Sequence, residues 1–144
     1  MKTEEKISTF QWKTPSRKQR KLLKWWAPIS PHKDKDIIIA DGAVRSGKTL
    51  SMSMSFILWA MSTFSNETFG LSGKTVGSFR RNVLINLKRV LRDEEYIVTE
   101  KRAENLLIIS KNGIENRFYI FGGKDEGSQD LIQGVTLAGM LFDE

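Results

Sequence analysis

Apolar and polar positions along this chain form blocks that predict strands and helices in turn. Residues 37–40 are a short β-branched run between polar flanks, which is typical of a buried strand. Residues 48–64 carry apolar side chains on almost every face, which predicts a helix inside a layered fold. Residues 74–80 predict a second strand, and residues 83–91 place apolar side chains at helical spacing. Strands that alternate with helices favour an α/β fold with a largely parallel sheet.

The C-terminal third of the chain predicts an inserted β-hairpin. Two apolar runs, residues 105–110 and 114–121, flank Asn112-Gly113. An Asn-Gly pair between such runs favours a tight turn. Residues 122–133 are mostly polar and predict a loop.

The N-terminal segment predicts a short helix and then a loop. Pro15 and Ser16 are typical of a helix start, and we expect the helix to end at about Trp26, before Pro28. Residues 27–36 contain two prolines and predict a loop.

The formal charge lies almost entirely at the N-terminus. The chain has 23 Lys and Arg against 17 Asp and Glu, yet residues 1–36 hold ten basic and four acidic side chains and residues 37–144 hold thirteen of each. We therefore divide the chain into a basic segment, 1–36, and a core, 37–144. The basic run can be a surface that meets nucleic acid, since neutralised phosphates release counterions. It can equally be a solvated helix. In the second case the inward-facing residues would be Leu22, Leu23, Trp25 and Trp26.

The composition excludes several classes of protein. The chain has no cysteine and a single histidine, His32, which excludes a disulfide framework, a thiolate nucleophile and a His-rich metal site. The first ten residues include two glutamates and no apolar stretch, so no secretory signal is predicted and the cytosol is the default location. The helix expected at residues 48–64 is short and polar for a membrane span.

One segment matches a nucleotide-binding motif at every fixed position. The pattern G-x-x-x-x-G-K-[ST] is filled by Gly42, Ala43, Val44, Arg45, Ser46, Gly47, Lys48 and Thr49. The glycines would let backbone amides converge on a phosphate, and the following helix would add its positive N-terminal end. Lys48 would reach the β- and γ-phosphates of ATP, and the Thr49 hydroxyl would bind Mg²⁺.

Two carboxylates meet the remaining requirements of ATP hydrolysis. Residues 138–142 predict an apolar strand, and Asp143 and Glu144 follow it directly. Phosphates lie at the carboxyl edge of the strands in open α/β sheets. Asp143 would hold Mg²⁺ through a water, and Glu144 would activate the attacking water, which favours an ATPase over a small-molecule kinase.

Arg45, inside the motif, has two possible roles. It can form a salt bridge on the outer face of the loop, or it can stabilise charge on the γ-phosphate during transfer. The sequence does not choose between them.

Together these features resemble the ATPase domain of the large terminase subunit, the DNA-packaging motor of tailed bacteriophages. The resemblance rests on the motif at residues 42–49, on residues 14–19, where Gln19 would face the adenine base, and on residues 129–144. Residues 79–81 also resemble a region in which the family keeps an arginine. The resemblance implies the three-layer P-loop NTPase fold.

The resemblance also implies a function and partners. The protein would use ATP and Mg²⁺ to move double-stranded DNA into procapsids. Its partners would be a small terminase subunit, the portal and procapsid, and further copies of the full-length subunit in a ring. It would work in the host bacterial cytoplasm, transiently at the portal and without a membrane.

The sequence departs from the family pattern after Glu144, because the expected nuclease domain is not reached. In P-loop ATPases with this Asp-Glu pair, the next strand inserts between the loop strand and the Asp-Glu strand. Residues 37–40 and 138–142 would therefore lack a shared neighbour, which leaves backbone groups unpaired. We expect an incomplete ATPase domain, truncated after the strand at 138–142 (the Walker B strand), that hydrolyses ATP poorly on its own.

Two other functions are compatible with the same residues. A helicase-like DNA-dependent ATPase also has a Gln upstream of the loop and an Asp-Glu pair. An inactive prophage remnant would only bind nucleotide or DNA.

Overall fold

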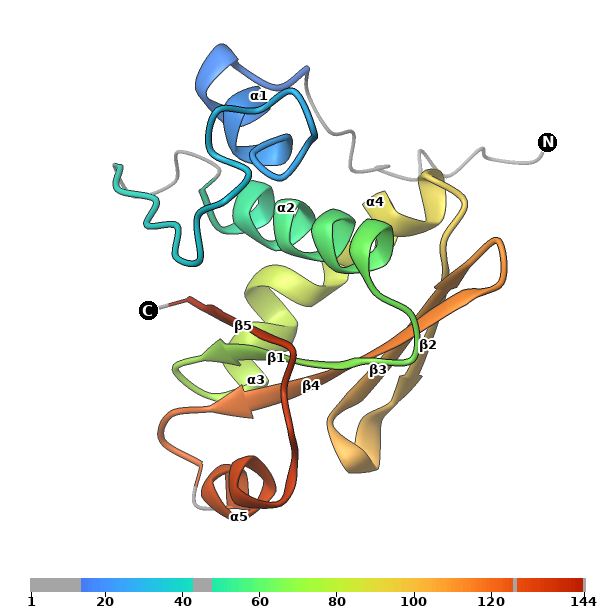
Figure 1. Cartoon of the computed structure of the whole chain (residues 1–144). Helices are drawn as coiled ribbons and strands as arrows, with labels where there is room; N and C mark the ends of the chain where they lie inside the picture. The colour runs from blue at the N-terminus through green and yellow to red at the C-terminus, as the bar shows by residue number, and fades with distance from the viewer. Residues whose placement is uncertain (1–13, 43–47, 126, 144) are drawn as a thin grey trace, which may run out of the picture.

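The computed structural model describes residues 14–42, 48–125 and 127–143 (Figure 1). The α-helices are α1 (Arg17–Leu23), α2 (Lys48–Thr63), α3 (Val76–Phe79), α4 (Ile85–Asp93) and α5 (Gly127–Gly134). A π-helical turn, η1 (Arg80–Leu84), joins α3 to α4, and a 3₁₀ turn, η2 (Arg102–Glu104), lies between two strands. The strands are β1 (Thr68–Gly73), β2 (Ile97–Lys101), β3 (Leu106–Lys111), β4 (Ile114–Gly122) and β5 (Gly139–Phe142).

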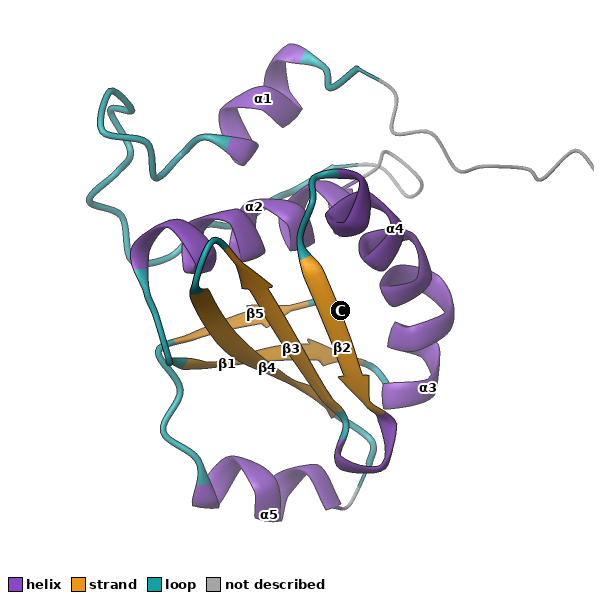
Figure 2. Cartoon of the chain, turned by 90° about the vertical axis from the view of Figure 1, so that its right-hand side faces the viewer, coloured by secondary structure: helices purple, strands orange, loops and turns teal. Residues whose placement is uncertain are grey.

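The strands form a mixed five-stranded sheet in the order β2-β3-β4-β1-β5 (Figure 2). β1 runs parallel to both β4 and β5, whereas β2 pairs with β3 and β3 with β4 in antiparallel fashion. The α/β class is confirmed, but the expectation of a largely parallel sheet is wrong. The reason is β2, which the sequence analysis did not predict and which extends the hairpin into a three-stranded antiparallel ribbon.

Helices α2 and α4 pack on the sheet, and α1 lies on the outer side of α2 (Figure 1). α5 lies on the opposite side of the strands from α1 and α2 (Figures 1 and 2). Between α2 and the sheet, Ile57, Phe69 and Phe118 are fully buried, and the two phenyl rings stack with centroids 5.2 Å apart. Burial of this apolar surface is the main stabilising contribution to such a domain.

Three predicted elements are confirmed. The helix expected at 48–64 is α2, the hairpin runs are β3 and β4, and the last strand is β5. The hairpin turn has positive φ at both central residues, 52° at Asn112 and 80° at Gly113. Asn and Gly adopt this backbone region most easily, so the two-residue turn follows directly from the sequence.

The prediction of a buried strand at residues 37–40 is wrong. These residues have no strand structure, and Ile37 and Ile39 are 79% and 86% exposed. No strand in the described part of the chain pairs with them or with the outer edge of β5. A β-branched run forms a strand only where a neighbouring strand pairs with its backbone and covers its side chains. Among the described residues, no strand lies between residues 37–40 and β5 to do this.

The prediction of a strand at residues 74–80 is also wrong. Thr75 and Ser78 form a reciprocal capping box: the Ser78 amide donates to Thr75 Oγ1 at 3.0 Å, and the Thr75 amide donates to Ser78 Oγ at 3.2 Å. The Val76 amide donates to Asp125 Oδ2 at 2.8 Å. These bonds satisfy the free amides of a helix start, so α3 begins here and the strand lies earlier in the chain, at β1.

Two further boundaries differ from expectation. α5 occupies most of the segment expected to be a loop at residues 122–133, and Asp130 in its first turn favours the helix N-terminus electrostatically. α1 starts as predicted, with Ser16 as the N-cap, but it ends at Leu23 rather than Trp26.

Candidate nucleotide and metal site

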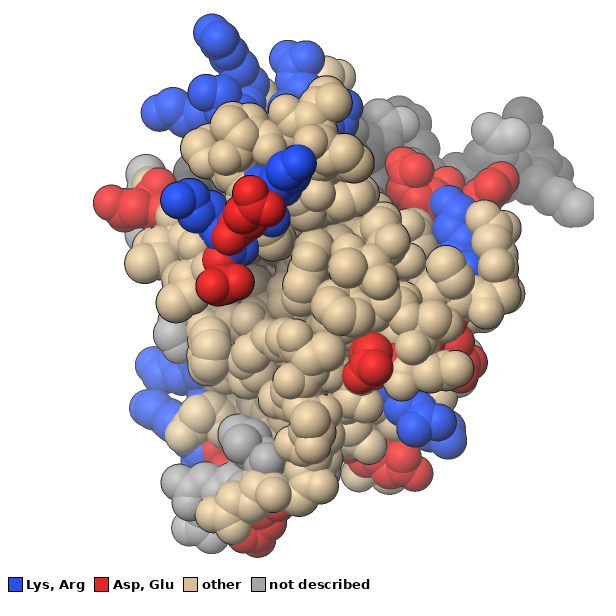
Figure 3. Space-filling model, viewed as in Figure 1, with Lys and Arg blue, Asp and Glu red and all other residues tan. Residues whose placement is uncertain are grey.

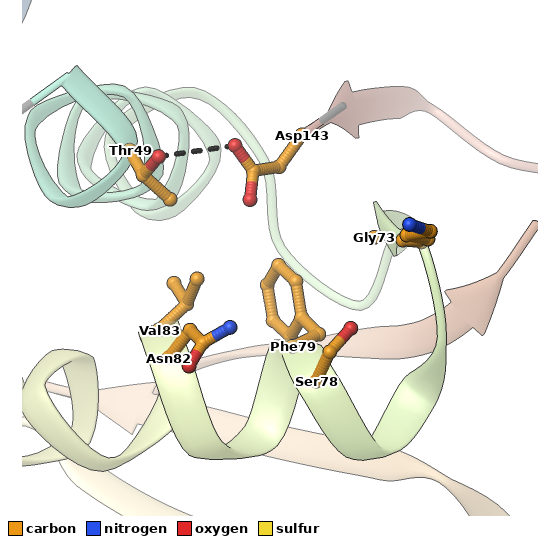
Figure 4. A pocket seen from close by; sticks show the side chains of 8 residues that line it. Thr49, Gly73, Ser78, Phe79, Asn82, Val83 and Asp143 are labelled. Carbon is orange, nitrogen blue, oxygen red and sulfur yellow. Dashed lines mark hydrogen bonds between the residues drawn. The ribbon is translucent and has the colours of Figure 1, made fainter. Parts of the chain in front are cut away.

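Thr49 and Asp143 meet at the carboxyl edge of the sheet although 94 residues separate them. The Thr49 hydroxyl donates a hydrogen bond of 3.0 Å to Asp143 Oδ1 (Figure 4). Thr49 lies in the first turn of α2, and Asp143 directly follows β5. The Asp143 amide donates to the Ser72 carbonyl at 2.8 Å, which continues the parallel pairing of β5 with β1 and holds the carboxylate in place.

Lys48 connects the two ends of the motif. Its ammonium group donates a hydrogen bond to the carbonyl of Gly42, the first motif residue. The ammonium group of Lys48 therefore lies at Gly42, and its expected role at the phosphates stays a prediction. The motif residues Ala43, Val44, Arg45, Ser46 and Gly47 lie outside the described residues, and so does Glu144.

A cavity of about 150 Å³ opens beside the Thr49–Asp143 pair (Figure 4). One wall comes from α2 and the end of β5, and the other comes from the end of β1, from α3 and from η1. Its lining residues are Thr49, Gly73, Lys74, Ser78, Phe79, Asn82, Val83 and Asp143. Hydroxyl, carboxylate, amide and ammonium groups thus share one small space.

The oxygen groups of this cavity are too few to bind a metal ion by themselves. They fit Mg²⁺, which also binds water and the phosphates of a substrate. Among the described residues, no group of three or more His, Cys, Asp or Glu side chains could hold a metal ion. Mg²⁺ typically keeps several waters and takes one or two protein oxygens together with phosphate oxygens of the substrate. Thr49 and Asp143 would supply those protein oxygens.

The structure places Gln19 in the cap of α1. Its Oε1 accepts a hydrogen bond of 2.9 Å from the Ser16 amide, and the Gln19 amide donates to Ser16 Oγ at 3.2 Å. α1 is tied to α2 by the Ser55 hydroxyl, which donates to the Leu22 carbonyl at 2.5 Å. Gln19 therefore has a structural role at the helix start, and its contact with adenine stays a prediction.

Arg80, one of the two arginines in residues 79–81, binds groups outside the cavity. Its Nη2 donates to the Asn105 Oδ1 at 2.8 Å, and its Nε lies 3.3 Å from Glu100 Oε1. Lys88 donates to Glu100 at 2.7 Å, and this hydrogen bond is the main cause that lowers the pKa of the Glu100 carboxyl. Arg80 thus fastens η1 to the β2–β3 ribbon.

The described part of the basic segment, residues 14–36, contains an amphipathic helix, which is compatible with both a nucleic-acid-binding surface and a solvated helix. The side chains of Arg17, Lys18, Arg20, Lys21 and Lys24 are exposed, and Figure 3 shows Lys and Arg gathered over α1. Leu22, Leu23, Trp25 and Trp26 are half-buried. The Trp25 ring lies 6.0 Å from that of Trp59 on α2, so Trp25 anchors the segment to the core.

Sequence reasoning missed Lys74 and Asn82, which also line the cavity. Neither belongs to a motif: Lys74 begins the expected strand at 74–80, and Asn82 lies between that strand and the helix expected at 83–91. Only the packing of α3 against β1 and β4, with η1 directly after it, brings them near Thr49.

An α/β sheet that brings Thr49 of the motif together with Asp143 defines a candidate nucleotide-binding protein. Comparison with solved structures specifies the relationship: the chain is homologous to the large terminase of a thermophilic bacteriophage. One crystal form of that terminase matches with a TM-score of 0.89 and 56% identity, over 92% of this chain and 32% of the terminase chain. The same terminase in complex with ADP matches with a TM-score of 0.84 and 56% identity, over 90% of this chain and 32% of that one. Its complex with ATP-γ-S matches with a TM-score of 0.82 and 52% identity, over 90% and 30%.

The chain thus spans about a third of the solved terminase chains that it matches. No protein-family model matches it, and no curated protein does. Among the described residues, no helix is long and apolar enough to cross a membrane.

Proposed function

We propose that this chain is the ATP-hydrolysing part of a bacteriophage large terminase, a motor that moves double-stranded DNA into procapsids. The observation that carries the proposal is the contact between Thr49 and Asp143 beside Lys48. It is supported by 56% identity to a terminase that has been crystallised with ADP and by 52% identity to the same terminase with ATP-γ-S. This identity favours a terminase over a helicase-like ATPase.

The proposed roles follow the chemistry of each group. Backbone amides of residues 42–49 would hold the phosphates, Lys48 would neutralise their charge, and Thr49 and Asp143 would position Mg²⁺, Asp143 through a water. When bound, Mg²⁺ would offset the charge that develops on the phosphate oxygens. Glu144 would orient and deprotonate the attacking water, and Arg45 would act at the γ-phosphate.

The proposed partners belong to the whole terminase. They are double-stranded DNA, a small terminase subunit, the portal of the procapsid and further terminase subunits in a ring. The site of action would be the host cytoplasm, transiently at the portal.

Asp143→Asn is expected to remove most of the Mg²⁺ dependence of ATP binding. The amide keeps the size of the carboxylate and can still accept from Thr49, but it lacks the charge that would hold the hydrated ion. Loss of such a group lowers metal affinity by about 10- to 100-fold. The measurement is ATP affinity by calorimetry over a Mg²⁺ titration.

Asp93→Asn is the matched control, because Asp93 is an exposed aspartate on α4 away from the cavity. Without Mg²⁺, Asp143→Asn should bind ATP at least as tightly as Asp93→Asn, because it removes a negative charge beside the phosphates. If Asp143→Asn retained the full Mg²⁺ response, Asp143 would have no part in the metal site. If the wild-type protein bound no Mg·ATP, the proposed function would be wrong.

We also expect DNA affinity that falls as salt rises, with the basic face of α1 contributing to the slope. Replacing Lys18, Arg20, Lys21 and Lys24 by glutamine should reduce the slope of log K against log salt by up to about 0.9 for each phosphate that is no longer neutralised. The paired change Arg89→Gln and Arg92→Gln on α4 is the control and should leave the slope unchanged. If the α1 variant showed an unchanged slope, the basic face of α1 would not bind DNA and would be only a solvated helix surface.

A further inference from the structure

We propose that Asn82 donates a hydrogen bond to the terminal phosphate of a bound nucleoside triphosphate and so helps the site to distinguish a triphosphate from a diphosphate. The inference rests on the proposed function, because it assumes that a nucleotide binds at residues 42–49. It adds a contact residue that lies outside the motif and outside the Asp-Glu pair.

The first argument is the position of Asn82 in the cavity. Asn82 lines the cavity on the side of η1, and Thr49 and Asp143 line it on the other side (Figure 4). Ser78, one turn earlier, also lines the cavity, but its hydroxyl already donates to the Thr75 carbonyl at 3.0 Å. Among the described residues, the carboxamide of Asn82 has no hydrogen-bond partner, and the side chain is exposed.

The second argument is the backbone that carries Asn82. It is the central residue of the π-helical turn η1, and such turns are rare and frequent at functional sites. Val83 and Leu84 anchor the turn in the core, where they are 3% and 1% exposed. Arg80 fixes its start through Asn105 and Glu100. Asn82 is therefore held on a rigid support, which a directional contact to a ligand requires.

The third argument is the part of the nucleotide that fits this cavity. Thr49 and Asp143, which would position Mg²⁺, line the cavity together with Asn82. A metal ion held by these two residues would neutralise phosphate oxygens of the nucleotide, so the cavity would lie at the phosphate end. Its volume of about 150 Å³ is below the roughly 300 Å³ of pockets that enclose a whole small ligand, and it suits a phosphate group with its hydrated ion.

Lys74 also lines the cavity, but its side chain is less suited than that of Asn82 to a directional hydrogen bond. Its ammonium group is a mobile point charge on a long flexible chain, whereas the amide of Asn82 is a short, directional donor. We therefore assign the discrimination between triphosphate and diphosphate to Asn82.

The test compares the affinities of ADP and ATP-γ-S, each with Mg²⁺, in the intact protein that carries these residues. Asn82→Ala should weaken ATP-γ-S by about tenfold, the size expected for one hydrogen bond to a charged group, and change ADP by less than about twofold. Asn82→Asp should weaken ATP-γ-S further, because it places a negative charge beside the phosphate. Asn86→Ala removes the same amide from the next turn, outside the cavity, and should change neither affinity.

The outcomes separate this inference from the proposed function. If the wild-type protein binds both nucleotides and Asn82→Ala binds ATP-γ-S as tightly as the wild type, Asn82 makes no such contact. An equal weakening of ADP and ATP-γ-S would also overturn the inference, because the residue would then support the site as a whole. If the wild-type protein binds neither nucleotide, the proposed function fails and this inference with it. Asn82 is exposed, so the variants should fold, and thermal unfolding verifies this.

Discussion

Lys48→Ala is expected to lower ATP turnover by the intact protein at least about 100-fold. The ammonium group lies over the start of the motif, where it donates to the Gly42 carbonyl. There it would neutralise the phosphates and the charge that develops during transfer, and loss of a single stabilising donor in a catalytic site typically costs about 10²- to 10³-fold. The measurement is steady-state release of phosphate at saturating Mg·ATP, together with ATP affinity.

Two companion variants make this result specific. Lys48→Arg keeps the charge but replaces a compact ammonium by a planar guanidinium, and it should restore little of the activity. Lys101→Ala, at an exposed position on β2, removes one positive charge away from the cavity and should be neutral. Turnover within about threefold of the wild type in Lys48→Ala would mean that residues 42–49 are not the phosphate site.

Asn116→Leu is expected to destabilise the fold by about 3 kcal/mol. Asn116 on β4 is fully buried. Its Oδ1 accepts from the Glu67 amide at 3.0 Å, and its Nδ2 donates to the Phe64 carbonyl at 3.0 Å and to the Ala60 carbonyl at 3.4 Å. Leucine has a similar size but removes the partner of the Glu67 amide and of the Phe64 carbonyl, at a cost of about 1–3 kcal/mol each, whereas the Ala60 carbonyl keeps its hydrogen bond from the Phe64 amide.

Urea unfolding tests this prediction. The midpoint should fall without a change in the slope against urea, since the surface exposed on unfolding stays nearly the same. Asn86→Ala serves again as the control, because Asn86 is only partly buried on α4. A midpoint equal to that of the control would show that the Asn116 amide does not join the end of α2 to β4 in solution.

Some elements followed from local pattern because their hydrogen bonds are local. The turn at Asn112-Gly113 needs two residues that adopt positive φ, and both types are present. The helix at α2 needs only its own backbone and an apolar surface to bury. Such elements depend on residues within a few positions of each other.

Other elements depended on distant partners and could not be predicted locally. Ile37 and Ile39 have the composition of a buried strand, yet they are exposed because no described strand pairs with them. At the start of α3, the Val76 amide donates to Asp125, 49 residues away, and this distant contact favours a helix over the expected strand. Asn116 is an ordinary polar residue in the sequence of β4, and its role appears only where β4 meets the end of α2.

The sequence by itself determined the α/β class and the resemblance to large terminases, and it predicts the candidate phosphate loop, because a motif with fixed spacing depends only on residue types and order. The tertiary structure decided that the sheet is mixed, that Thr49 and Asp143 share a hydrogen bond, and that Asn82 lines the same cavity. The physical reason is that strand pairing and the juxtaposition of side chains 94 residues apart depend on packing across the whole chain, which no local pattern records.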